Sequence, residues 1–139
     1  MAKVAIPKRE EELRAKLMSE LRHYLPHFVC FRHEDIRTSG IPDIEVNGNR
    51  ITTHWETKHG TPEFTSPGIQ ELTNQRLARQ SHSRYIIWQE GVDGARTLIV
   101  HPDEVKNRQS FSTIVPEALA IGFDMYWLML EIAKAHGIK

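Results

Sequence analysis

Hydrophobic and polar positions alternate along this chain with two different periods. Over residues 8–24, leucines recur three to four positions apart and a proline follows, which predicts an amphipathic helix. The apolar run at residues 28–33 predicts a first strand, interpreted as central because most of its residues are apolar. Residues 67–80 predict a second helix that opens with a proline at a tolerated position.

The second half of the chain predicts two more strands and a long helix. Residues 85–88 and 96–100 are apolar runs joined across a glycine-containing turn, typical of paired strands. A short helix is predicted at residues 102–105. Residues 116–136 are apolar nearly all round, which predicts a buried C-terminal helix. Together the order of elements predicts an α/β (α+β) domain, with a central mixed sheet between helices on both sides.

Two strands are predicted on either side of Asn47-Gly48, a strong hairpin signal. Because side chains alternate across a strand, Glu56 and Lys58 share one face of the second strand. A four-residue loop at 47–50 puts Asp43 opposite His54 with Glu56 on its diagonal, roughly 7–8 Å away.

Other loop lengths separate the two acids. A two-residue loop at Asn47-Gly48 would put Asp43 opposite Thr52 and leave Glu56 four residues further along. A three-residue loop without a bulge would turn Asp43 to the other face. We therefore expect the four-residue loop.

The acids and the lysine on these strands suit metal-dependent cleavage of phosphodiester bonds. Two carboxylates can hold Mg²⁺, a hard cation that prefers oxygen ligands and keeps several waters. Such an ion stabilises charge on phosphate and lowers the pKa of bound water. Lys58 would orient that water. The alternative is that Pro42-Asp43 is an ordinary turn and Glu56 with Lys58 an exposed ion pair.

Pro42-Asp43 with Glu56-Thr57-Lys58 resembles the signature of the PD-(D/E)XK nuclease superfamily. The Gly40-Ile41-Pro42-Asp43 opening and a glutamine-bearing helix after the lysine are most similar to stand-alone virus-type replication-repair nuclease (VRR-NUC) modules. The resemblance implies a restriction-endonuclease-like core and a DNA endonuclease dependent on Mg²⁺ or Mn²⁺. It implies Asp43, Glu56 and the Thr57 main-chain carbonyl as metal ligands, with Gln70 in support. Phage endonuclease I-type junction resolvases look similar too, and a nucleic-acid-binding module that does not cut is the remaining alternative.

A glutamate on the first helix is the remaining candidate. Glu10 falls in the middle of the leucine face, where an acid is unusual unless it has a partner. The resemblance implies a first-helix glutamate near the metal. We therefore interpret Glu10 as a metal ligand, with Glu20 as the alternative.

Charge and composition change this picture only locally. The 139 residues suit one domain, residues 1–139, and 18 basic and 18 acidic residues give no net charge. Arg76, Arg79 and Arg84 occur in a stretch without acids, so they are predicted to contact DNA phosphates. A single cysteine suits a reducing compartment, and no apolar stretch suits a membrane span or a signal peptide, so a cytoplasmic protein is expected.

The apolar residues at 125–130 also predict a homodimer. Six in a row cover every side of a helix, whereas one sheet face can accept only one side. Tyrosine, tryptophan or methionine would then face outward, and these residues are enriched at the cores of interfaces. The alternative is that residues 107–115 wrap over this helix within one chain.

Overall fold

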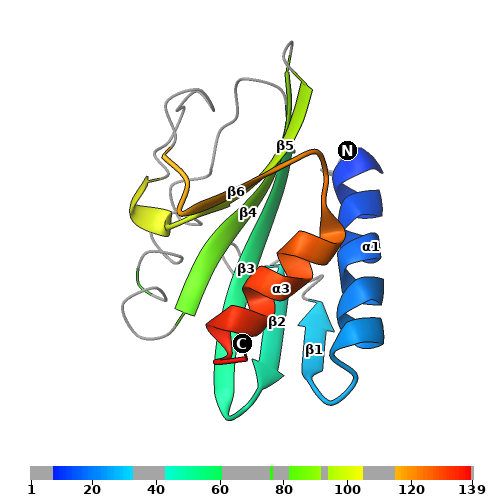
Figure 1. The fold of residues 1–139 in the computed structure, drawn as a ribbon, viewed down its shortest axis with the longest axis vertical. Helices are drawn as coiled ribbons and strands as arrows, with labels where there is room; N and C mark the ends of the chain where they lie inside the picture. Colours follow the sequence, from blue (N-terminus) through cyan, green and yellow to red (C-terminus); the bar gives the residue numbers. More distant parts are fainter. Residues whose placement is uncertain are drawn as a thin grey trace, which may run out of the picture.

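A six-stranded mixed sheet forms the centre of the fold in the computed structural model (Figure 1). The structure describes residues 8–32, 43–60, 76, 82–91, 94–104 and 115–138. The strands lie in chain order across the sheet, and only β3 and β4 pair in parallel. They are β1 (Val29–Arg32), β2 (Ile44–Gly48), β3 (Ile51–Gly60), β4 (His82–Gly91), β5 (Gly94–Val100) and β6 (Ala118–Ile121).

The first helix, α1 (Lys8–Tyr24), has the predicted bounds. Its leucines pack into the main core with residues of β2, β3, β4 and the C-terminal helix α3 (Met125–Ala135). Trp55 and Trp88 are the largest buried side chains of that core. A second buried cluster, on the other face of the sheet, consists of Tyr85, Ile87, Leu98 and Val100. Strand β4 is therefore buried on both faces, as its apolar run predicted.

Both described helices lie on the same face of the sheet, where α1 stands beside α3 (Figure 1). The helix predicted at residues 67–80 lies outside the described residues, apart from Arg76, so helices on both sides remain a prediction. The 3-10 turn η1 (Pro102–Glu104) matches the short helix predicted after β5. Within the described ranges, no helix is long and apolar enough to cross a membrane.

The prediction of a central first strand was wrong. β1 pairs only with β2 among the described strands and forms one edge of the sheet. Its apolar content misled the interpretation because Val29 and Phe31 point outward and are about half exposed. Only the alternate position Cys30 packs against the core.

The prediction of one helix over residues 116–136 was also wrong in its first part. Residues Ala118–Ile121 form strand β6, which pairs antiparallel with β5. Gly122 follows with φ 74°, a left-handed conformation that breaks regular structure before the helix starts. Asp124 then caps α3 by accepting a hydrogen bond from the Trp127 backbone N–H at 2.9 Å.

The hairpin between β2 and β3 turns at a different place from the predicted loop. Its two central residues are Asn49 and Arg50, with φ 54° and 63°, the left-handed conformation of tight hairpin turns. Gly48 lies in β2, where an added Cβ would stand 2.4 Å from the Phe28 ring. The Asn-Gly signal was therefore misread: the glycine makes room for an aromatic ring rather than for a turn.

Candidate functional site

The hairpin register brings Asp43 and Glu56 face to face across two neighbouring strands. Ile44 pairs with Trp55 and Glu45 with His54, so the same register places Asp43, just before β2, opposite Glu56. The predicted register put His54 opposite Asp43 and Glu56 on its diagonal. The observed register is shifted by two residues, so Glu56 itself lies opposite Asp43. The two acids are consequently closer than predicted, and they are hydrogen-bonded to each other.

Thr57 fixes the Asp43 carboxylate from the next position along β3. Its backbone N–H donates to Asp43 Oδ2 at 2.8 Å, and its hydroxyl donates to the same oxygen at 2.9 Å. The residue is buried, with 1% of its surface exposed. Both bonds come from the Thr57 amide and hydroxyl. The Thr57 main-chain carbonyl, which was predicted as a metal ligand, takes no part in them.

The environment drives the pKa values of the two acids apart. Burial raises the pKa of Glu56 well above its ordinary value, and the hydrogen bond to Asp43 and the Asp43 charge raise it further. Burial also acts to raise the pKa of Asp43, but the hydrogen bond with Glu56, the Arg14 charge and the Thr57 donors together lower it. Of the two acids, Glu56 thus has the raised pKa and Asp43 the lowered one.

Glu10 lies beside this pair at the first turns of α1. Its Oε1 accepts a hydrogen bond from the His59 backbone N–H at 3.1 Å, which ties the helix to the end of β3. Burial raises the pKa of Glu10, although the charges of Arg14 and Lys58 oppose that shift. Lys58 therefore lies close enough to act electrostatically on both Glu10 and Glu56.

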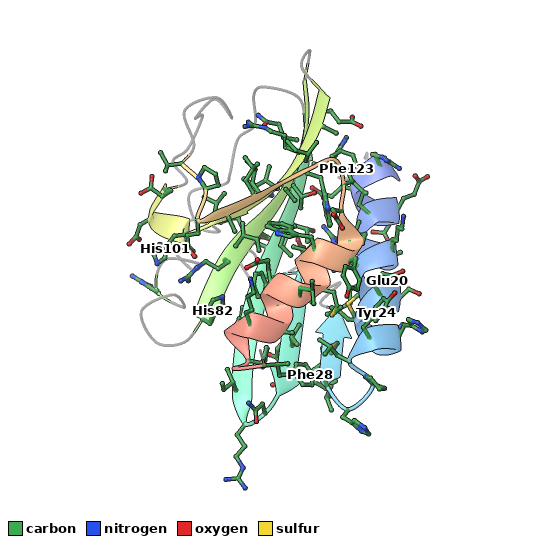
Figure 2. All side chains as sticks on the ribbon, in the orientation of Figure 1. Glu20, Tyr24, Phe28, His82, His101 and Phe123 are labelled. Carbon is green, nitrogen blue, oxygen red and sulfur yellow. The ribbon has the colours of Figure 1, made fainter. Side chains whose placement is uncertain are left out.

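Glu20 stands away from this group. It lies ten residues after Glu10 on the same helix, about 15 Å along the axis at 1.5 Å per residue. Figure 2 shows Glu20 near Tyr24, toward the end of α1 remote from Phe123. Phe123 marks the site end, because its ring contacts the His59 ring at 6.0 Å between centroids. Of the two glutamates, the structure therefore brings only Glu10 to the acidic pair.

The sequence interpretation missed Arg14. Its side chain is buried, with 2% exposed, and its Nη2 lies 3.1 Å from Glu10 Oε2 and 3.2 Å from Asp43 Oδ2. Its Nε donates to the Thr57 hydroxyl oxygen at 2.9 Å. A signal was present, since Arg14 comes three residues before one leucine of the buried face and seven before the next. The same spacing had singled out Glu10.

The predicted DNA-contacting residues are only partly described. Gln70 and Arg79 lie outside the described residues, as do residues 39–42 of the motif. Arg76 is exposed. Arg84 lies on β4 and forms an ion pair with Glu117, with Nε and Oε1 2.9 Å apart. Its charge is therefore balanced by an acid at the start of β6, a partner that sequence spacing alone did not indicate.

The chemistry of the Asp43–Glu56 pair fits a divalent ion with oxygen ligands. Two opposed carboxyl groups that share a proton can release it and bind a cation between them. Mg²⁺ is commonly held by one or two carboxylates with waters and phosphate oxygens completing its shell. In the described ranges, no group of three or more histidine, cysteine, aspartate or glutamate side chains could hold a metal ion. The protein ligands fitted by the geometry are therefore two carboxylates, not three.

Comparisons with known proteins agree with this fold. No family model and no curated protein matches the chain. Among solved structures, it is similar to Hjc, a Holliday junction resolvase from the archaeal hyperthermophile Archaeoglobus fulgidus. The match has a TM-score of 0.55 and 18% sequence identity, and covers 91% of this chain and 99% of that chain. The predicted fold class, an α+β fold with a restriction-endonuclease-like mixed sheet, is confirmed, and helices on both sides of that sheet stay a prediction. The narrower VRR-NUC resemblance stays a prediction.

Proposed function

We propose that this chain is a metal-dependent DNA endonuclease that hydrolyses phosphodiester bonds in branched DNA. The carrying observation is the Asp43–Glu56 pair, a half-buried and a buried acid held face to face, with Lys58 two residues beyond Glu56 on the same strand. Two carboxyl groups held together inside a protein raise one pKa and disfavour the metal-free charged state. Such an arrangement is typical of a cation site rather than of a solvated ion pair.

Each residue has a defined part in this proposal. Asp43 and Glu56, with the Thr57 carbonyl, would hold Mg²⁺ or Mn²⁺, and the bound ion supplies charge stabilisation and an acidified water. Lys58 orients the attacking water and offsets negative charge on the phosphate. Gln70 is proposed to support the site. Glu10, predicted from the sequence as a metal ligand, bonds to Arg14 and to the His59 backbone N–H here, and we propose that it supports Asp43 through Arg14.

The proposed substrate is a four-way junction or a flap in DNA. The similar protein Hjc is named as a Holliday junction resolvase, and its fold covers nearly the whole of this chain. Arg76 and Arg79 are proposed to contact DNA phosphates. Arg84 would have to break its ion pair with Glu117 before it could contact a phosphate. We place the activity in the cytoplasm, in phage-type replication, recombination or repair, with an endonuclease I-type resolvase as the alternative form.

A cleavage panel tests the proposal. The purified protein is incubated with four-way junction, flap, linear duplex and single-stranded DNA, with Mg²⁺ or with a chelator. We expect cleavage of the junction or the flap, only in the presence of Mg²⁺. Binding of junction DNA without cleavage of any substrate would reject the enzyme and favour a binding module. Equal cleavage of all four substrates would reject the preference for branched DNA.

We also propose that the chain forms a homodimer through a tyrosine patch, consisting of Tyr24, Tyr126 and Leu130. Helix α3 buries Met125, Leu128, Met129, Ile132 and Ala133. Tyr126 remains 55% exposed and Leu130 40%, while the Tyr24 ring of α1 lies 5.6 Å from the Tyr126 ring. The outward residues are therefore tyrosines and a leucine, because the methionines and most of Trp127 pack inward.

Light scattering at micromolar concentration tests the dimer. We expect a mass near twice 16.1 kDa for the natural protein and near 16.1 kDa for Tyr126→Arg, because a charge at the centre of the patch opposes its burial. The matched control is Ile121→Arg, at an apolar residue of β6 that is 79% exposed outside the patch. A monomeric natural protein, or loss of the dimer in the control alone, would contradict this assignment.

A further inference from the structure

Arg14 is a buried cation enclosed by the candidate site. Its guanidinium contacts four residues from three elements: Glu10 and Glu11 of α1, Asp43 before β2 and Thr57 of β3. With 2% of its side chain exposed, it is among the largest fully buried side chains of the protein. A buried charge without partners is strongly destabilising, so an arginine in this place requires the acids around it.

One nitrogen of Arg14 bridges two carboxylates. Its Nη2 lies 3.1 Å from Glu10 Oε2 and 3.2 Å from Asp43 Oδ2, so both acids contact the same guanidinium nitrogen. Two acids brought together from different elements would repel each other without a cation between them. In two-metal nucleases a second divalent ion, roughly 3.5–4 Å from the first, commonly fulfils that need.

Both oxygens of Glu10 already have protein partners in this arrangement. Its Oε2 is taken by Arg14, and its Oε1 accepts the His59 backbone N–H. Across the ranges that the structure describes, no three histidine, cysteine, aspartate or glutamate side chains are arranged so that they could hold a metal ion. The ligands that remain for a metal ion are therefore those of the Asp43–Glu56 pair.

We propose that Arg14 is a positioning residue that stands in for a second metal ion, so that the site takes a single divalent ion on Asp43 and Glu56. The inference rests on the proposed function and deepens it, because it fixes the metal stoichiometry. Arg14 holds the Asp43 carboxylate toward Thr57 from one side and leaves its other side to the ion. It also balances Glu10, which otherwise would be a third ligand.

Metal counting tests the inference without reference to activity. Mn²⁺ is titrated into the protein and free ion is followed by electron paramagnetic resonance, and ions still bound to Asp43→Asn are subtracted as sites elsewhere. We expect one ion for each natural chain. Arg14→Gln removes the cation and frees Glu10, so we expect a second ion in that variant. Arg14→Lys keeps a charge and should bind one, as should Arg22→Gln, a control for loss of an exposed arginine on α1.

The same variants give a second readout in cleavage. Groups that orient metal ligands typically change metal affinity 10–100-fold when replaced, so Arg14→Gln should need roughly that much more Mn²⁺ for half-maximal cleavage. Two ions in the natural protein with cleavage intact would overturn this inference and leave the proposed function standing. No bound ion and no cleavage would overturn both. If Arg14→Gln does not fold, as judged by near-ultraviolet circular dichroism, the counts for the natural protein and Arg14→Lys decide.

Discussion

We expect Asp43→Asn to lose DNA cleavage by about three orders of magnitude while it keeps its fold. A bound metal ion supplies several kcal/mol of transition-state stabilisation, and each 1.36 kcal/mol corresponds to a tenfold rate. The asparagine oxygen can still accept the two Thr57 hydrogen bonds, so the strand register should hold. Single-turnover cleavage of a four-way junction in Mg²⁺ measures the loss, and circular dichroism confirms the fold.

Two variants make this result specific. Glu45→Gln changes a carboxylate of β2, two residues after Asp43, whose side chain is hydrogen-bonded to Asn47. It should cleave within a few-fold of the natural rate. Asp43→Ala removes a partner of buried Arg14 as well, so it should lose both cleavage and some stability. Normal cleavage by a folded Asp43→Asn protein would remove Asp43 from the site.

The strand faces and the first helix could be predicted from the sequence because they depend on local periodicity. Leucine spacing gave the bounds of α1, and alternation placed Glu56 and Lys58 on the face opposite Trp55. That Asp43 and Glu56 lie on one face of the sheet needed only the parity of the hairpin. Any loop shift of two residues keeps both acids on one face. That is why the shared face of Asp43 and Glu56 was predictable although the predicted loop was wrong.

What could not be predicted depends on contacts distant in sequence. Gly48 reads as a turn residue, but the ring that it accommodates belongs to Phe28, twenty residues earlier. The turn at Asn49 is held from the other end of the chain, because its side-chain amide donates to the His136 carbonyl at 2.6 Å. The place of Arg14 in the site likewise depends on its contacts with Asp43 and Thr57, which only the fold brings to α1.

The second large effect concerns stability, because we expect metal-free Glu56→Gln to melt higher than the natural protein at pH 8. Glu56 has its pKa raised above the ordinary 4.5 by burial and by Asp43, so its folded form prefers the proton. The stability contributed by such an acid is present below its ordinary pKa and is lost as pH rises through its folded pKa. Glutamine is neutral at every pH and can donate to Asp43 as the protonated acid does. The advantage of the variant should therefore appear at pH 8 and vanish near pH 4.

Calorimetry with and without Mn²⁺ separates this effect from ordinary surface changes. Each kcal/mol moves the melting temperature of a domain of this size by about 4 °C, so a gain of a few degrees is measurable. Asp43 does not mask it, because a lowered pKa removes stability only as pH falls through the folded value. Mn²⁺ should raise the melting temperature of the natural protein by mass action and leave Glu56→Gln nearly unchanged. If Glu56→Gln melted below the natural protein in metal-free buffer at pH 8, Glu56 could not be the protonated member of a strained pair. The charge repulsion between Asp43 and Glu56 lowers the stability of the metal-free protein, and the same two charges attract the ion.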